Sequence, residues 1–248
     1  MSIGTPNRVL SQQQLAELAK YDTPTICNAI ELFDVRPRNA GYMDQRIQCC
    51  FEHFPPMVGY ATTATFGSDA PADGPSTYDR LNEQIETLAQ LQAPPVMVFQ
   101  DLDDPPVAAT FGEVMCATYQ AFGAVGIVTS GGGRDLDQVE ALKFPAFIGS
   151  TLCAHAYTQI RAIDVAVRVG GMTVRPGDLL HGDRNGITTI PNEIASEVAE
   201  AAAGLVAAEG SVLNYLKQGS CTPSGYRQAM EESKRQMNNL AVRYRLKR

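Results

Sequence analysis

The chain has 248 residues, of which 44% are hydrophobic and 19% are charged, a composition typical of a soluble globular protein with one substantial core. No stretch approaches the roughly eighteen consecutive apolar residues of a membrane span, and residues 1–18 lack the basic and apolar segments of a secretory signal, so we expect a cytoplasmic protein. The net charge of −7 is unevenly distributed: residues 227–248 carry seven basic and two acidic side chains, which leaves 13 basic and 25 acidic groups elsewhere.

The basic C-terminal segment is compatible with two kinds of partner. A basic tail on an acidic body can bind nucleic acid. More often such a tail packs on an acidic surface of its own or of a neighbouring subunit, and we favour that interpretation over nucleic-acid binding.

Six cysteines are present, and none forms a C-x-x-C pair. This spacing argues against a zinc knuckle or a thioredoxin-like site. Without a secretory signal we expect reduced thiols. A vicinal disulfide between the adjacent Cys49 and Cys50 would be rare, and we do not expect it.

The N-terminal part of the chain predicts two helices. Ser11 and Gln14 form a capping box that starts a helix over residues 12–20. Thr23 is the expected N-cap of a second helix, with Pro24 at its first position.

Three further segments continue this α/β pattern. The valine- and threonine-rich residues 58–66 predict a strand. Apolar residues at helical spacing predict a helix over 76–92. Residues 95–100 predict a buried strand that runs into the acidic loop "DLDDPP".

The segment "FGEVMCATYQAFGAVGIVTSGGGRD" predicts a helix, a glycine stop, a strand and a glycine loop in succession. Two adjacent apolar stripes predict that the helix is largely buried. Gly123 is the expected residue just after its end. The apolar run "AVGIVTS" is typical of a strand covered on both faces, and residues 144–150 predict another.

A β-rich unit follows, with turns expected at Gly170-Gly171, Pro176-Gly177 and Asn185-Gly186. Pro191 then opens an alanine-rich helix over about residues 192–208, and further helix extends to the C-terminus. No linker divides the chain, so we expect one compact domain.

The glycine loop raises the functional question. Gly131, Gly132 and Gly133 follow a buried strand, where open sheets place their ligand crevices, although a flexible turn is the plainer interpretation. Gly112 and Glu113 begin the preceding helix, whose start can lie at the same edge of the sheet. Glu113 also suits the helix dipole, which would be a purely structural role.

Together these residues would form a pocket for an anion and a metal ion. Free N–H groups at the helix start and the planar cation Arg134 suit a carboxylate or an oxyanion. Asp135 and Glu113 offer hard oxygens for Mg²⁺ or Mn²⁺. Because Mg²⁺ keeps several waters and takes one or two protein carboxylates, no histidine cluster is needed.

At these residues the sequence resembles a known family. Gly112-Glu113, the intervening residues 114–133 and Arg134-Asp135 match the signature of 4-hydroxy-4-methyl-2-oxoglutarate (HMG) and 4-carboxy-4-hydroxy-2-oxoadipate (CHA) aldolases, whose fold family includes the regulator of ribonuclease E activity (RraA). The resemblance extends in order over about residues 20–210 and includes "DTPTICNAI", "VGYATTAT", "GAVGIVTSGGGRDLDQV", "FPAFIGS" and "VRVGGMTVRPGDLLHGDRNGITTIP". One departure is Asn28, where many members carry an acid.

The resemblance implies an architecture. It implies an α/β fold, a single-domain αββα sandwich of the swivelling β/β/α type over residues 1–248. Residues 1–20 would form an N-terminal helical extension, and residues 211–248 a basic helical extension at the C-terminus. It also implies a homotrimer or homohexamer with sites between subunits.

The resemblance also assigns roles. Asp135 would ligate the divalent metal, and Glu113 would hold metal-bound water. Arg134 would bind the pyruvyl part of a 2-oxo acid and stabilise its enolate. Backbone N–H groups across Gly112, Glu113, Val114 and Met115 would bind the substrate carboxylate. The expected reaction is cleavage of a 4-hydroxy-2-oxo acid to pyruvate, with oxaloacetate decarboxylation as a side activity.

Several alternatives stay open at this stage. Candidate bases are His155, His181, or a metal-bound water activated by Glu113 or by an acid of a neighbouring subunit, whereas Asp178 and Asp183 suit turns. A Schiff-base mechanism would need a lysine, and only Lys143 is near the motif.

The sequence bears differently on two other functions. A non-catalytic regulator of ribonuclease activity is the alternative function, against which the retained metal-ligand position Asp135 argues. A methyltransferase is not supported, because no G-x-G-x-x-G loop follows a strand with a suitably spaced acid.

Overall fold

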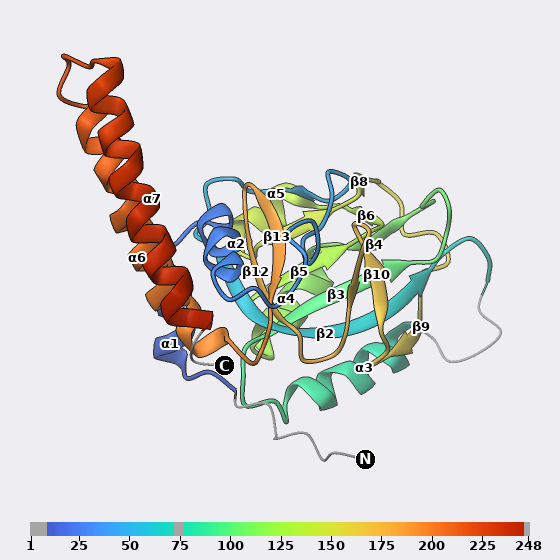
Figure 1. Ribbon diagram of the computed structural model, residues 1–248. Coiled ribbons are helices and arrows are strands. Elements are labelled where there is room, and N and C mark those ends of the chain that lie inside the picture. The colour runs from blue at the N-terminus through green and yellow to red at the C-terminus, as the bar shows by residue number, and fades with distance from the viewer. Residues whose placement is uncertain (1–8, 72–76, 246–248) are drawn as a thin grey trace.

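An eight-stranded mixed sheet forms the centre of the molecule in the computed structural model, which describes residues 9–71 and 77–245 (Figure 1). The strand order is β1-β7-β5-β3-β2-β12-β13, and β9 pairs with β2. Neighbours among β2, β3, β5 and β7 pair in parallel, and the other pairs are antiparallel. The bounds are β1 (Gln48–Cys49), β2 (Met57–Gly67), β3 (Pro95–Asp101), β5 (Gly126–Thr129), β7 (Ala146–Ile148), β9 (Gln159–Ile163), β12 (Leu179–Asp183) and β13 (Gly186–Ile190).

The parallel strands are largely apolar because both of their faces are covered. On β3, Met97 and Phe99 pack into a cluster with side chains of α4 (Glu113–Ala121) and α5 (Leu136–Ala141). Val96 and Val98, on the opposite face, pack with the hairpin of β10 (Val167–Val169) and β11 (Met172–Val174). Alternate residues of β3 thus pack into two hydrophobic clusters on opposite faces of the sheet. This explains why consecutive residues of the strand are apolar.

A second, three-stranded sheet positions the site. It contains β4 (Ala109–Phe111), β6 (Gly132–Gly133) and β8 (Ser150–Thr151), all parallel. Along the chain these short strands follow β3, β5 and β7 of the main sheet. Gly132 and Gly133 fit here because a Cβ would lie 2.8 Å from Leu152 Cδ1 and 2.6 Å from Phe111 Cζ, respectively. The glycine loop is therefore part of a tightly packed sheet, not a flexible turn.

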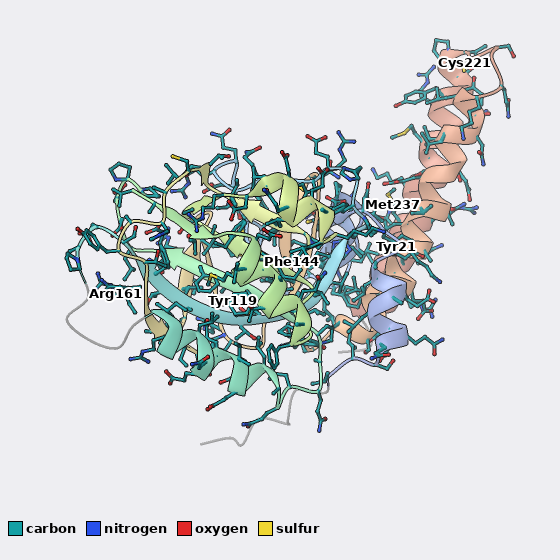
Figure 2. The ribbon with its side chains drawn as sticks, turned by 180° about the vertical axis from the view of Figure 1, so that it is seen from behind. Tyr21, Tyr119, Phe144, Arg161, Cys221 and Met237 are labelled. Atoms are coloured by element: carbon teal, nitrogen blue, oxygen red, sulfur yellow. The ribbon has the colours of Figure 1, made fainter. Side chains whose placement is uncertain are left out.

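The C-terminal residues form a long helical hairpin of α6 (Ala195–Leu216) and α7 (Pro223–Arg245). Its base packs on α1 (Gln12–Leu18) and α2 (Thr23–Glu31) through one apolar cluster, and its outer half projects away from the sheets (Figure 1). Figure 2 shows Cys221 at the far end of the hairpin and Met237 nearer the body. The remaining helix, α3 (Thr77–Leu88), contacts β9.

Two arginines near the end of the basic tail pair with acidic groups elsewhere in the protein. Arg243 Nη2 bonds to Glu200, and Arg245 Nη2 lies 3.8 Å from Asp34 Oδ2. Within residues 9–71 and 77–245 no helix is long and apolar enough to cross a membrane. The six cysteines are free thiols.

The α/β fold class is confirmed, with α1 and the hairpin as the added terminal helices. The assignment of residues 211–248 as an extension stays a prediction, and α6 runs through residue 211 without a break. Residues 1–8 of the predicted N-terminal extension lie outside the described residues, as does the start of the helix predicted over 76–92.

Two local predictions were wrong. The N-cap of α2 is Asp22, not Thr23, because the Asp22 carboxylate accepts a 2.9 Å hydrogen bond from Thr25 N. Helix α4 is not largely buried: Val114 is 75% exposed and Phe122 is 44% exposed. One apolar stripe of α4 faces the core through Cys116 and Tyr119, and the other faces outward.

Candidate active site

The two halves of the Gly-Glu/Arg-Asp motif meet at the edge of the three-stranded sheet. In the β4–β6 pair, Phe111 lies opposite Gly133, so the next residues, Gly112 and Arg134, leave the sheet side by side. The Arg134 N–H donates to Phe111 O at 3.1 Å. Parallel pairing of two short strands thus brings together residues that are 22 positions apart.

Asp135 is the centre of this junction. Its backbone is left-handed, with φ 54°, and it stands at the N-cap position of α5 without capping that helix. Instead its Oδ2 accepts a 3.0 Å hydrogen bond from Glu113 N at the start of α4. The same oxygen lies 3.7 Å from Arg134 Nε. Within the described residues Oδ1 makes no hydrogen bond, so it is available to a ligand.

Gly112 is required by this contact. A Cβ at Gly112 would lie 2.4 Å from Asp135 Oδ2 and 3.0 Å from Arg134 Nε. Any side chain would therefore displace the carboxylate or the guanidinium. The glycine of the motif is explained by close approach rather than by an unusual φ, since Gly112 has extended backbone at φ −146°.

A cavity of about 460 Å³ opens beside the motif. Arg134 and Asp135 contribute partly exposed side chains to its wall, and the guanidinium makes no further ion pair among the described residues. The wall consists of Pro71, Leu81, Ala109, Thr110, Phe111, Gly112, Val114, Met115, Arg134, Asp135, His155, Ala156, Tyr157, Thr158 and Gln159.

The start of α4 offers the cavity two hydrogen-bond donors. Asp135 already occupies the N–H of Glu113. Among the described residues, the N–H groups of Val114 and Met115, also in the first turn, have no acceptor, and both residues line the cavity. Free N–H groups at a helix N-terminus, next to an arginine, favour an anion.

The side chain of Glu113 lies elsewhere. It is exposed and lines a shallow groove on the outer face of α4, with Val114, Ala117 and Phe122. The described wall of the cavity does not include Glu113. Its backbone thus belongs to the junction, whereas its carboxylate would have to turn to reach a metal ion bound by Asp135.

The two candidate histidines have different surroundings. His155 is exposed on the cavity wall, and its Nδ1 lies 2.8 Å from Ala156 O. His181 is fully buried, with Nδ1 3.0 Å from Thr23 Oγ1 and Nε2 3.3 Å from Leu18 O. Burial lowers the pKa of His181. A neutral histidine that joins α1, α2 and β12 is structural.

The carboxylates of Asp178 and Asp183 accept hydrogen bonds from backbone N–H groups, and Lys143 lies away from the cavity. Asp178 Oδ2 accepts from Arg175 N at 2.8 Å within a turn. Asp183 accepts from Thr23 N at 2.9 Å and from Asn185 N at 2.7 Å. Lys143 lies just after α5 with φ 56° and is absent from the described cavity wall.

The available carboxylate oxygens fit a divalent cation that keeps most of its water ligands, rather than one surrounded by protein ligands. Within the described residues no group of three or more His, Cys, Asp or Glu side chains could hold a metal ion. Asp135 lines the cavity, and its Oδ1 makes no hydrogen bond among the described residues. This is what Mg²⁺ needs when water completes its octahedron.

Sequence analysis missed most of the opposite wall. Tyr157 comes from the segment between β8 and β9, Gln159 begins β9, and Thr110 comes from β4. No local pattern marks them, because their position depends on how β4, β6 and β8 pair. Asp101, at the end of β3, is a buried acid near this wall and was also missed.

Comparison with known proteins gives the family. Residues 23–189 match the model of the Aldolase/RraA family, described as RraA-like. The chain is 39% identical over 84 residues to a Halalkalibacterium halodurans protein with the provisional name 4-hydroxy-4-methyl-2-oxoglutarate aldolase, which covers 34% of this chain and 40% of that protein. It is 32% identical over 113 residues to an uncharacterized Methanocaldococcus jannaschii protein, with 45% and 54% covered. The chain thus spans about half the length of these relatives or less.

Two solved structures share the fold. An uncharacterized Pseudomonas syringae protein superposes with a TM-score of 0.70 at 23% identity, covering 93% of this chain and 99% of that chain. Streptomyces coelicolor RraAS2, described as an unusual member of the RNase ES inhibitor RraA family, gives a TM-score of 0.61 at 22% identity, with 79% and 93% covered. The protein therefore belongs to the RraA-like family, which includes HMG/CHA aldolases and RraA regulators.

Proposed function

We propose that the protein is a divalent-metal-dependent aldolase that cleaves a 4-hydroxy-2-oxo acid, such as 4-hydroxy-4-methyl-2-oxoglutarate, to pyruvate and a second carbonyl compound. One observation carries the proposal: the Asp135 carboxylate, the Arg134 side chain and the start of α4 meet on one wall of a single cavity. This combination suits a hard cation and an anionic substrate at the same place.

The chain would bind the 2-oxo acid by its charged end. The N–H groups of Val114 and Met115 would donate to the substrate carboxylate. Arg134 would donate to the pyruvyl oxygens as a planar fork. Gly112 would let the substrate approach the backbone, and the apolar wall with Leu81 and Phe111 would exclude water from the rest of the ligand.

Asp135 would hold the Mg²⁺ or Mn²⁺ ion directly through Oδ1, and Glu113 would hold it through water after its side chain turns toward the cavity. When bound, the cation supplies Lewis-acid polarisation of the 2-oxo group. The Asp135 carboxylate would be held in place by the hydrogen bond from Glu113 N and by the nearby Arg134 guanidinium.

Arg134 would stabilise the charge that develops when the C3–C4 bond breaks. As the 4-hydroxyl loses its proton, the electron pair of that bond moves into the pyruvyl fragment, and the negative charge collects on the 2-oxo oxygen. A fixed guanidinium beside that oxygen lowers the barrier without reorganising water. Loss of CO₂ from oxaloacetate develops the same charge, so decarboxylation is an expected side activity.

The outer face of α4 supports assembly into a homo-oligomer, as a trimer or a hexamer. Val114 and Phe122 are large apolar side chains that are 75% and 44% exposed, and Ala117 and Ala121 complete an apolar groove. Glu113 lines the same groove. Association through this face would bring the Glu113 carboxylate to a subunit boundary, beside the cavity.

The test is pyruvate release from a panel of 2-oxo acids, including 4-hydroxy-4-methyl-2-oxoglutarate and oxaloacetate, with Mg²⁺ or Mn²⁺ and with excess EDTA. We expect turnover that chelation abolishes and added metal restores. Turnover that survives complete chelation contradicts the metal-dependent scheme. No turnover on any acid, together with inhibition of a ribonuclease, would favour the regulator instead.

A further inference from the structure

A buried acid lies behind the cavity and takes no part in the scheme above. Asp101 ends β3 and is 9% exposed. Its Oδ1 accepts a 3.0 Å hydrogen bond from Asp103 N, which forms the turn after the strand. Its Oδ2 is buried without a hydrogen-bond partner. The turn needs only Oδ1, so Oδ2 has no structural role.

The unpartnered oxygen faces the same small space as a hydroxyl of the cavity wall. A Cβ built on Gly131 would lie 2.2 Å from Asp101 Oδ2 and 2.6 Å from Thr110 Oγ1. Both oxygens therefore approach one face of Gly131, where only a glycine leaves room. Thr110 lines the cavity, and Asp101 does not.

Hydrogen bonds around Thr110 leave it able to pass a proton. Gly131 N donates to Thr129 Oγ1 at 2.9 Å. The hydroxyls of Thr129 and Thr110 lie 2.9 Å apart. If Thr129 donates to Thr110, the hydrogen of Thr110 is free to move to Asp101 while its oxygen accepts another proton from the cavity.

We propose that Asp101 and Thr110 form a proton relay that takes the substrate's hydroxyl proton and returns it to the pyruvyl methyl carbon. This inference rests on the proposed aldolase function. In cleavage, the Thr110 hydroxyl first turns to donate to the unpartnered Asp101 Oδ2. Thr110 Oγ1 then accepts the 4-hydroxyl proton and passes its own proton to Oδ2 as the C3–C4 bond breaks. The reverse shuttle then protonates C3. One proton leaves oxygen and one reaches carbon, so Asp101 ends as the carboxylate that it was.

The surroundings of Asp101 suit such a group. Burial raises the pKa of Asp101 to about 6; the Asp103 N–H opposes this rise, and the Asp103 charge adds to it. Thr110, Ser130 and Gly131, which face it from β4 and the loop after β5, carry no titratable group. Asp103 is the charged neighbour, itself bonded to Ser68 and close to Arg161 of β9. A base that titrates near neutral pH is efficient at that pH.

Asp101 acts only through Thr110, so it is a positioning residue and its test needs matched variants. Asp101→Asn keeps an oxygen for Asp103 N and removes the titration. Thr110→Val keeps the shape and removes the hydroxyl, whereas Thr110→Ser restores it. His155→Asn removes the other candidate base on the cavity wall.

Two readouts are taken for each variant with Mg²⁺: the pH profile of kcat for cleavage, and deuterium exchange into the methyl group of pyruvate by proton NMR. We expect the wild-type kcat to rise through about pH 6, as set by Asp101. Asp101→Asn and Thr110→Val should lose about 10²-fold or more in kcat and in exchange, with little change in KM. Thr110→Ser should keep the wild-type profile, and in His155→Asn, whatever its rate, the rise in kcat should stay near pH 6.

The outcomes separate the two proposals. A wild-type protein that neither cleaves any 4-hydroxy-2-oxo acid nor exchanges pyruvate overturns the aldolase and the relay together. If the wild-type protein is active and the pH profile of kcat is the same in Asp101→Asn or Thr110→Val, the relay alone is overturned. If His155→Asn loses the rise in kcat near pH 6 and Asp101→Asn keeps it, His155 is the base. Thermal unfolding checks that each variant is folded.

Discussion

Glu113 and Asp135 are joined by a 3.0 Å hydrogen bond from the backbone of one to the side chain of the other, across 22 positions of sequence. The bond makes Asp135 the N-terminal cap of a helix to which it does not belong. It also ties the start of α4, the proposed anion-binding site, to the proposed metal ligand. The motif therefore acts as one unit, and its residues can be tested as one unit.

Asp135 carries separable structural and chemical roles. Asp135→Ala removes the cap of α4 and should cost about 0.5–2 kcal/mol in the free energy of unfolding. Asp135→Asn keeps an oxygen for Glu113 N but loses the charge, so it should stay near wild-type stability and still lose metal-dependent turnover. Urea unfolding and pyruvate release check the two effects. Full turnover in either variant would contradict the assigned metal ligand.

Arg134 should matter for chemistry far more than for folding. Its side chain is 34% exposed and its pair with Asp135 is 3.7 Å long, so the ion pair adds little stability. Arg134→Ala should lower kcat/KM by about 10²-fold or more, the effect of removing one oxyanion donor. Arg46→Ala is the control, because Arg46 also pairs with a carboxylate (Asp44) at the surface. Equal effects on turnover would remove Arg134 from the site.

Gly112 should tolerate no side chain. The Cβ of Gly112→Ala would lie 2.4 Å from Asp135 Oδ2, so the carboxylate must move and turnover should fall sharply. We expect a loss of about 1–3 kcal/mol in stability from overpacking. Gly210→Ala is the matched control, since its Cβ would meet only Asn214 Nδ2 at 3.9 Å within α6. That variant should gain up to about 1 kcal/mol, because alanine favours helix.

Asp101→Asn should stabilise the protein at neutral pH. Burial raises the folded-state pKa of Asp101 to about 6 from its ordinary 3.8, so the wild-type fold disfavours the carboxylate. The wild type should therefore lose stability as the pH rises from about 4 to about 6, and the variant should not. The difference should approach 2–3 kcal/mol at most, at about 1.4 kcal/mol per pKa unit. Urea unfolding at pH 4.5 and 7.5 measures it; a pH-independent difference would contradict the raised pKa.

Phe122→Asp should weaken self-association. A charge in the apolar groove of α4 would have to be desolvated in any interface formed there. Leu91→Asp is the control, since Leu91 is 45% exposed, almost the same as the 44% of Phe122, and lies outside that groove. Light scattering after gel filtration gives the mass of each variant. An unchanged mass for Phe122→Asp would place the interface elsewhere, for example on the hairpin.

Features that depend on residues close together in the sequence could largely be predicted. The order of helix, glycine stop, strand and glycine loop placed the start of α4 and the Arg134 segment at one edge, and the structure brings them together. Gly123 ends α4 with φ 92°, as expected. The cap of α2 was misplaced by one residue because Thr23 and Asp22 are both good caps, and only the bond to Thr25 N distinguishes them.

Long-range pairing explains what the sequence could not show. Two apolar stripes on α4 predicted a buried helix, but periodicity cannot tell a core-facing stripe from one that faces outward. The three-stranded sheet of β4, β6 and β8 contains strands of two or three residues, too short for a sequence signal. Thr110 and Asp101 become neighbours through that pairing and through the absence of a Cβ at Gly131.

The projecting hairpin offers a way to measure how copies of the chain are arranged. Its tip carries Cys221, an exposed thiol whose sulfur lies 3.7 Å from Tyr215 O and Leu216 O of the same hairpin. With the other exposed thiol removed as Cys153→Ser, a nitroxide spin label could be attached at Cys221. Because a stiff pair of helices fixes the label far from the body (Figure 2), dipolar distances between labels would report the symmetry of an assembly directly.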